Sequence, residues 1–329
     1  MIKRILLCLL VLLGVSVILY ILVRIMPSNF VNKMFDSQVS QGQLKEEDIQ
    51  RMKELFGIAD NSFGGILKGY FTWLGNAVRL NFGESFLYTG QTVQGVIAKY
   101  MWISFAIAFI SMILAYLIAI PLGTKAAVSQ YGKLDYTTSV LAMLGISLPS
   151  FFLSALLIKA LCVDTGLFPV QGISDATMNW DGNPVGLFFN EAYHLVVPIL
   201  VVVILEIGGT LRFTRTNTLE VLNADYIRTA RAKGVSERWV VYKHSFRNTM
   251  IPLVSSLAGA IPAMFSGSII IETVFSIPGI GNMAYKAMEA GDIPFIMGYN
   301  MFLAILTVLG TLLADLMYAV VDPRVKIMR

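Results

Sequence analysis

The sequence is poor in charge for its length. Only 14% of its 329 residues are Asp, Glu, Lys or Arg, whereas 56% are hydrophobic and the mean hydropathy is +0.69. Average globular chains carry roughly a quarter charged residues. The composition therefore favours a membrane protein over a soluble fold.

Cysteine and histidine are equally scarce. The two cysteines, Cys8 and Cys162, lie far apart in or beside apolar stretches, so they form neither a disulfide framework nor a zinc pattern. The two histidines, His194 and His244, are separated by a predicted membrane span. We therefore expect no metal site in this chain.

Motifs that bind nucleotides are also missing. No glycine-rich loop ends in Gly-Lys-Ser or Gly-Lys-Thr, so the chain has no phosphate cradle for ATP. The short motif Gly279-Ile280-Gly281 lacks a third glycine and does not follow a predicted strand. We expect no catalytic residue and no cofactor in this chain, and no autonomous enzyme activity.

Long apolar runs dominate the rest of the sequence. A helix needs about 20 apolar residues to cross the hydrocarbon core, and the uncharged runs are 5–23, 100–124, 136–158, 248–271 and 293–314. A shorter run at 192–205, interrupted by Glu206, is counted because the loop charges require a crossing there. A cleaved signal peptide is the alternative for the first run, but no small-x-small site follows it. The sequence thus predicts an all-α membrane protein with six transmembrane helices.

Basic residues in short loops give the orientation, because they stay in the cytoplasm. Lys125 and Lys133 follow the second run, segment 212–248 follows the fourth, and Arg324 lies in the carboxyl-terminal tail. Segment 164–191 holds four acidic residues and no Lys or Arg, which suits the outside. We expect both termini in the cytoplasm.

Three parts of the chain follow from this topology. Residues 1–25 form the first transmembrane helix, and residues 26–99 form an extracellular insertion between the first two spans. Ile49, Met52 and Phe56 predict an amphipathic helix within that insertion. Residues 100–329 form a core with five transmembrane helices and the cytoplasmic loop 212–248.

Charged and helix-breaking residues in or beside the spans are candidates for a transport pathway or gate. A charge facing lipid is costly, so such residues face protein, water or the interface. Glu206 is the strongest candidate for a pathway residue, because Gly208 and Gly209 follow it and allow a close helix approach or a break in the helix. The alternative role of Glu206 is a structural ion pair. The other candidates are Ser147, Pro149, Pro262 and Glu272. The prolines are kinks that serve packing or hinging, and Glu272 has the alternative role of pinning the turn that follows it.

Segment 212–248 is expected to contain a short helix, because it holds residues that favour the beginning and the end of a helix. Asn223 or Asp225 is expected to cap its first turn, and Gly234 to end it in a left-handed conformation. A helix that projects from a membrane protein into the cytosol is suited to docking a partner. The segment has few stacking aromatics, so nucleic acid is not the expected partner.

This segment also carries a family resemblance. The run Arg228-Thr229-Ala230-Arg231-Ala232-Lys233-Gly234, with 243–248 after it, resembles the EAA loop of binding-protein-dependent ABC importers, in the variant of the oligopeptide, dipeptide and nickel permeases. Arg228 and Thr229 fill the glutamate and first alanine positions of the broader pattern. Further matching stretches lie at 70–75, 81–85, 272–281 and 315–324.

The resemblance implies a permease subunit of an ATP-driven importer in a bacterial-type cytoplasmic membrane. The implied partners are a second homologous permease, two ATPase subunits that bind ATP and Mg²⁺, an extracellular or periplasmic solute-binding protein, and membrane lipid. The implied substrates are oligopeptides or dipeptides, with nickel chelates or another small solute as the alternative. A secondary transporter or channel that works without ATP is the alternative from a different class.

The residues expected to form the ATPase-coupling helix are Asn223, Asp225, Tyr226, Ile227, Arg228, Thr229, Ala230, Arg231, Ala232, Lys233 and Gly234. Among them, Tyr226 and Ile227 are expected to be apolar anchors, and Ala230 and Ala232 to allow close seating.

Overall fold

The computed structural model describes residues 2–25, 62–175 and 177–321. These residues form helices and loops, apart from an isolated bridge between Glu84 and Thr92, so the all-α prediction is confirmed for this part of the chain. The amphipathic helix predicted around Met52 and the basic tail at Arg324 lie outside the described residues.

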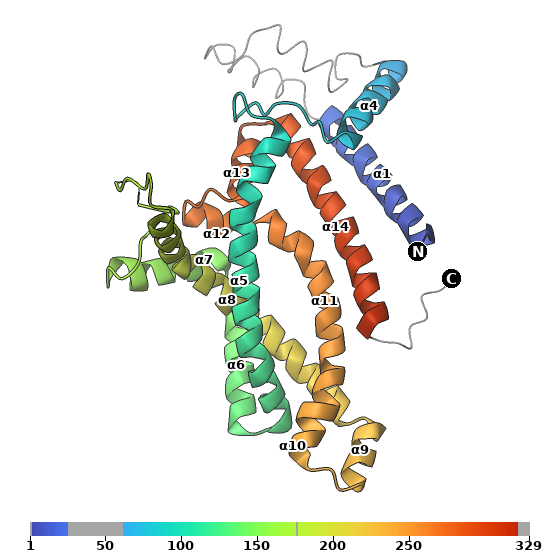
Figure 1. The fold of residues 1–329 in the computed structure, drawn as a ribbon, viewed down its shortest axis with the longest axis vertical. Helices are drawn as coiled ribbons and strands as arrows, with labels where there is room; N and C mark the ends of the chain where they lie inside the picture. Colours follow the sequence, from blue (N-terminus) through green and yellow to red (C-terminus); the bar gives the residue numbers. More distant parts are fainter. Residues whose placement is uncertain (1, 26–61, 176, 322–329) are drawn as a thin grey trace.

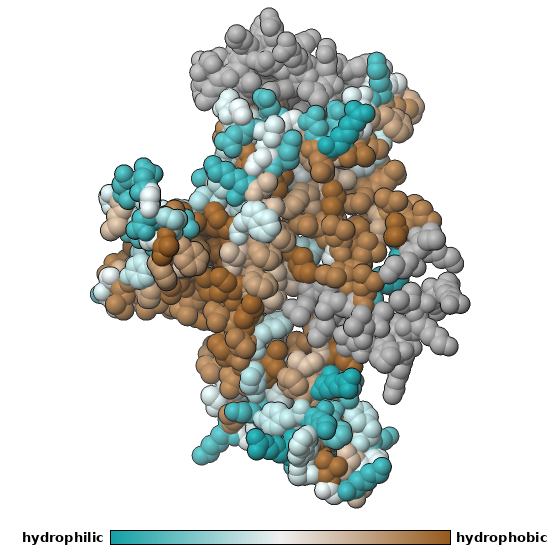
Figure 2. Space-filling model, in the orientation of Figure 1, coloured by the Kyte–Doolittle hydropathy of each residue, from teal (hydrophilic) through white to brown (hydrophobic). Residues whose placement is uncertain are grey.

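Within the described residues, four helices are long and apolar enough to cross a membrane. They are α1 (Ile2–Ile25), α5 (Val93–Val128), α8 (Pro184–Leu222) and α14 (Ile293–Val321). In Figure 1 α5 runs along the long axis of the molecule, with α14 and α1 beside its upper half. Hydrophobic residues gather across the middle of the molecule and hydrophilic residues toward both ends of that axis (Figure 2). This distribution is the one expected for a protein that crosses a bilayer.

The third apolar run is not a continuous span, contrary to the prediction for 136–158. Helix α6 (Lys133–Ser147) and the following pair, α7 (Ser150–Leu157) with the π-helix η1 (Ile158–Val163), meet at an angle of 102°. The break falls at Pro149, which disfavours helical backbone in the residue before it. Leu148 accordingly has an extended ψ of 125°. Pro149 thus lies between two helices rather than inside one.

The fifth apolar run is also interrupted. Helix α11 (Phe246–Ser266) contains Pro262 and ends at Gly267, whose φ is +71°. A short helix α12 (Ile269–Val274) follows as a separate element. The described helices therefore provide four spans, or five if the bent pair counts as one, and the count of six stays a prediction.

The spans pack closely where small residues meet backbone. Helix α5 packs most extensively against α8, while α6 packs against α8 and α11 against α14. A Cβ built on Gly123 in α5 would lie 2.8 Å from the Leu211 carbonyl oxygen of α8. Glycine is therefore required for this approach of the two backbones.

A hydrophobic core closes one end of the helix assembly. It joins α4 (Phe63–Val78), α13 (Ile280–Glu289), the segment before α5 and the first turns of α14, around Trp73, Phe82 and Phe295. The buried Asp292 carboxylate accepts hydrogen bonds from the backbone N–H groups of Leu87 (3.1 Å) and Phe295 (3.0 Å). These bonds tie the segment before α5 to the start of α14.

The opposite end carries three short elements. Helices α9 (Asp225–Ala232) and α10 (Glu237–Trp239) and the π-helix η2 (Val240–Ser245) connect α8 to α11. In Figure 1 α9 and α10 lie together at the bottom of the molecule, far from α13.

Candidate functional site

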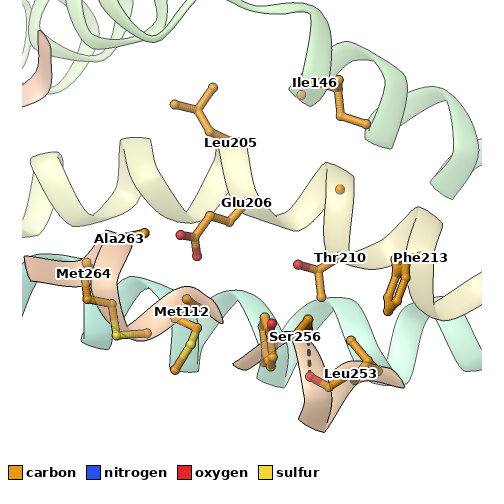
Figure 3. A pocket seen from close by; sticks show the side chains of 15 residues that line it. Met112, Ile146, Leu205, Glu206, Thr210, Phe213, Leu253, Ser256, Ala263 and Met264 are labelled. Carbon is orange, nitrogen blue, oxygen red and sulfur yellow. Dashed lines mark hydrogen bonds between the residues drawn. The ribbon is translucent and has the colours of Figure 1, made fainter. Parts of the chain in front are cut away.

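A cavity of about 600 Å³ lies between α5, α6, α8 and α11. Its walls are mostly apolar and include two methionines. Lining residues that figure in the argument are Met112, Gly145, Glu206, Gly209, Thr210 and Met264. In Figure 3 the Glu206 side chain extends from α8 toward Met112, Ala263 and Met264.

Glu206 is half-buried in this cavity. Its Oε2 atom is shielded from solvent and has no hydrogen-bond partner among the residues that the structure describes. A carboxylate in such surroundings retains a desolvation cost that an incoming donor or cation can offset.

The two glycines after Glu206 face different neighbours. A Cβ on Gly208 would lie 2.6 Å from the Ala142 carbonyl oxygen of α6, whereas a Cβ on Gly209 would have no neighbour within 4 Å. Gly208 therefore permits α6 and α8 to pack, and Gly209 leaves room in the cavity, which it lines.

The remaining pathway candidates are not brought together with Glu206. Ser147 is exposed, donates a hydrogen bond to the Met143 carbonyl oxygen (2.8 Å) and is not among the residues that line the cavity, and neither are Pro149 and Pro262. Gly145, close to Ser147 in sequence, does line it. Hydropathy could not predict this choice, because the face of α6 that meets α8 is defined by contacts between segments that are distant in sequence, such as Gly145 against the Ile204 carbonyl oxygen.

Glu272 lies at a second, separate position. Its buried carboxylate accepts hydrogen bonds from Ser104 Oγ (2.7 Å) on α5 and from the backbone N–H groups of Ser268 (3.0 Å) and Asn282 (2.8 Å). A Cβ on Gly279 would lie 2.4 Å from this carboxylate. Glu272 thus fixes the turn between α12 and α13 against α5.

Helix α9 has the stop that the sequence predicts. Gly234 has a φ of +77°, in the left-handed region. Its N–H donates to the Arg231 carbonyl oxygen (3.0 Å), and the Val235 N–H donates to the Ala230 carbonyl oxygen (3.2 Å). This pair of bonds is the Schellman motif that ends helices at glycine.

The predicted start of α9 is wrong. Asn223 is the carboxyl-terminal cap of α8, and the residue that precedes α9 is Ala224, whose side chain makes no capping bond. Asp225 is instead the first helical residue, where its negative charge is favourable near the positive end of the helix dipole. The reason is that α8 continues to Leu222, which leaves only a two-residue link.

Contacts within the chain hold α9 in place. Ile227 is completely buried, so it anchors α9 to its own chain rather than presenting an apolar group outward. The exposed Tyr226 accepts a hydrogen bond from Asn248 Nδ2 (3.1 Å) at the start of α11. The Arg231 guanidinium donates to both Glu237 oxygens (2.6 and 3.0 Å), and these bonds lower the pKa of the Glu237 carboxyl.

The outer surface of α9 is polar and open. Arg228, Thr229, Ala232 and Lys233 are exposed. Thr229 and Ala232 have short side chains, whereas Arg228 and Lys233 beside them carry positive charge.

Two further charged residues in or beside the apolar runs, Lys159 and Asp315, have partners in the chain. Lys159 Nζ lies 2.8 Å from the Asp164 carboxylate, and Arg4 on α1 contacts the Asp315 carboxylate on α14. An ion pair missed by the sequence joins Asp135 on α6 to Arg215 on α8. The residues are 80 positions apart, and no spacing rule connects them.

Comparisons with known proteins agree with this arrangement. A family model described as "Binding-protein-dependent transport system inner membrane component" matches residues 119–327. The chain is 34% identical to the "Oligopeptide transport system permease protein AppB" of Bacillus subtilis (strain 168), over 99% of this chain and 98% of that protein. It is 31% identical to the "Dipeptide transport system permease protein DppB" of Lactococcus lactis subsp. cremoris (strain MG1363), over 99% and 98%.

A solved structure shares the fold. It is titled "Inward facing conformations of the MetNI methionine ABC transporter: CY5 native crystal form", and the match has a TM-score of 0.51 at 18% identity, covering 69% of this chain and 96% of that chain. Together with the family match over more than half of the sequence, these findings show that the chain belongs to the binding-protein-dependent transport system inner membrane components.

Proposed function

We propose that this chain is one of two permease subunits of an ATP-driven peptide importer. Full-length similarity to permeases named for oligopeptide and dipeptide transport supports peptides as the substrate class. In this proposal ATP and Mg²⁺ bind to two partner ATPases, and a solute-binding protein delivers the peptide from outside.

The proposed topology has six spans with both termini in the cytoplasm. The bent α6–α7 pair and the α11–α12 region supply the two crossings beyond the four long helices. Segment 26–99 and the acidic segment 164–191 then lie outside, while α9, α10 and η2 face the cytosol. The basic composition of 212–248 supports this orientation.

One observation carries the mechanism. The 39-residue helix α8 lines the cavity through Glu206 and Gly209 and ends at Leu222, and a link of two residues separates it from α9. A displacement of α9 by an ATPase is therefore transmitted to the cavity wall along one continuous helix. Such a connection supports alternating access, with the cavity as this subunit's half of the pathway.

The test is reconstitution of the importer in proteoliposomes. The chain is co-expressed with its partner permease and ATPases, purified through a tag on this chain, and supplied with peptide-loaded binding protein. We expect the ATPases to co-purify, and peptide uptake to require ATP. Peptide uptake that proceeds without ATP would instead identify a secondary transporter, and uptake of a nickel chelate but not of peptides would overturn the substrate class.

A further inference from the structure

We propose that Glu206 binds the amino-terminal ammonium group of a peptide during its passage through the cavity. This inference rests on the proposed function and assigns a residue-level recognition step to it. The carboxylate would then be a binding residue of the membrane subunit itself, in addition to any selection by the binding protein.

The electrostatics of the cavity carry the first part of the argument. Glu206 is the one charged residue among the described residues that line the cavity. Its Oε2 atom has no partner in the described part of the chain. A half-buried carboxylate in apolar surroundings gains more from a cationic donor than an exposed one does, since the surroundings screen the attraction less.

The direction of the Glu206 side chain also supports binding of a group in the cavity. Glu206 does not point toward α6, although Gly208, two residues later, is packed against that helix. Figure 3 shows its carboxylate on the side of α8 that faces Met112 of α5 and Met264 of α11, with Thr210 one turn further along on the same side. A group held between these helices is therefore within reach of the carboxylate from the open space of the cavity.

Cavity size and wall chemistry fit a short peptide segment. Small-molecule sites enclose roughly 300–1,000 Å³ and combine apolar walls with a few polar groups, and this cavity has about 600 Å³. Met112 and Met264 are flexible and polarisable, so they adapt to different side chains. The other polar side chains of the wall, such as Thr210 and Ser256, carry uncharged hydroxyl groups, so the Glu206 carboxylate is the strongest acceptor in the cavity.

The amino-terminal ammonium group is common to peptides of any sequence, so one carboxylate can bind it whatever the side chains are. The α-amino group has a pKa of about 7.7–8.0 and is mostly protonated at neutral pH. A divalent cation, by comparison, takes about six or more oxygen ligands, mostly from several carboxylates and carbonyls. A single carboxylate within apolar walls therefore favours the amine over a metal ion.

A thermodynamic cycle isolates this contact from the preference of the binding protein. Uptake of one peptide and of its N-acetylated form, which lacks the amino-terminal charge, is measured in proteoliposomes holding wild-type or Glu206→Gln importer. Each peptide is preloaded on saturating binding protein, and kcat is compared. The ratio of kcat for the free peptide to kcat for the acetylated peptide is then compared between the two importers. The preference of the binding protein affects both importers equally, so it cancels in this comparison.

We expect Glu206→Gln to reduce kcat for the free peptide about tenfold or more, because a charge-assisted bond is lost. The acetylated peptide should be affected little, so the ratio of free to acetylated rates falls by the same factor. Glu206→Asp, which keeps the charge, should retain part of the preference. The matched control is Glu220→Gln, on the same helix at an exposed position outside the cavity, and it should leave the ratio at the wild-type value.

Equal free-to-acetylated ratios in wild-type and Glu206→Gln importers would overturn the assignment of Glu206. Loss of assembled complex in Glu206→Gln, with a normal ratio in Glu206→Asp and in any surviving Gln complex, would also overturn it and identify a structural ion pair with the second permease. Failure of the wild-type importer to move the free peptide at all would instead overturn the proposed function.

Discussion

The Arg215 guanidinium on α8 donates two parallel hydrogen bonds to the Asp135 carboxylate on α6. Nη2 lies 2.8 Å from Oδ2, and Nε donates to Oδ1. Oδ2 also accepts the Tyr131 backbone N–H (2.9 Å), in the turn between α5 and α6. The Asp135 side chain is only 5% exposed. The ion pair thus joins α6 to the last turns of α8, and the Tyr131 hydrogen bond ties both to the turn that follows α5.

Removal of the guanidinium should loosen this junction. Arg215→Ala leaves a buried carboxylate with only uncharged donors, the Tyr131 backbone N–H and the Ser139 side chain. We therefore expect it to lower the free energy of unfolding by about 1–3 kcal/mol, or more if the charge stays uncompensated. The effect should appear as a lower thermal midpoint of the purified complex in nanodiscs.

Arg215→Lys is the control for charge alone. An ammonium group keeps the attraction but cannot form the two parallel bonds, so its midpoint should fall between wild type and Arg215→Ala. If both variants unfold at the wild-type temperature, the ion pair contributes nothing to stability.

Gly234→Val should uncouple the importer. The φ of +77° at this position disfavours a β-branched residue, and a Cβ there meets no atom within 4 Å. The cost, about 1–2 kcal/mol, therefore comes from the backbone and not from a clash. We expect a distorted end of α9 and loss of peptide-stimulated ATP hydrolysis, measured in proteoliposomes.

Gly234→Asn provides the matched control, because asparagine tolerates the left-handed region. It should retain most of the stimulation. Normal peptide uptake by Gly234→Val would contradict the proposed role of α9 as the coupling helix.

The features that sequence predicted well are local. The stop of α9 follows from one glycine with a required backbone conformation, and the long runs around α5 and α14 are read directly from hydropathy. Gly234 and the apolar runs need no knowledge of distant residues, since their effects act within a few positions of the chain.

The features that sequence did not predict depend on packing between distant segments. Hydropathy alone reads 136–158 as one span, but whether Pro149 kinks or breaks a helix depends on the neighbours that accept the bend. The expected cap of α9 at Asn223 or Asp225 is wrong because α8 extends beyond its apolar run to Leu222, which makes Asn223 the end of α8 and Asp225 the first residue of α9. The cost of a charge in lipid marks Glu206 from sequence alone, but the cavity around it also needs residues of α5 and α11.

The proposed topology is open to labelling from outside. In a background without Cys8 and Cys162, single cysteines at Ser62→Cys and Asp181→Cys should react with a membrane-impermeant thiol reagent on intact cells, or on spheroplasts where an outer membrane is present. Both positions are exposed. Glu237→Cys should react only after the membrane is opened. Labelling of Glu237→Cys in sealed cells would overturn the assignment of α9 and α10 to the cytosol.

Gly208 and Gly209 should respond in opposite ways to the same substitution. In Gly208→Ala the new methyl group would lie 2.6 Å from the Ala142 carbonyl oxygen and 3.0 Å from Ile146 Cγ1. Backbone cannot yield as a flexible side chain does, so α6 and α8 must separate, and we expect a loss of about 1–3 kcal/mol in the free energy of unfolding. Gly209→Ala meets no atom within 4 Å and replaces glycine inside a helix, so it should leave stability unchanged or raise it by up to about 1 kcal/mol. Thermal unfolding of the two variants, measured side by side, compares their stabilities directly, because each variant adds one methyl group at neighbouring positions of α8.

Equal stability of the two variants would show that α6 and α8 do not pack through Gly208. The part of the cavity wall that depends on this contact would then be assigned wrongly.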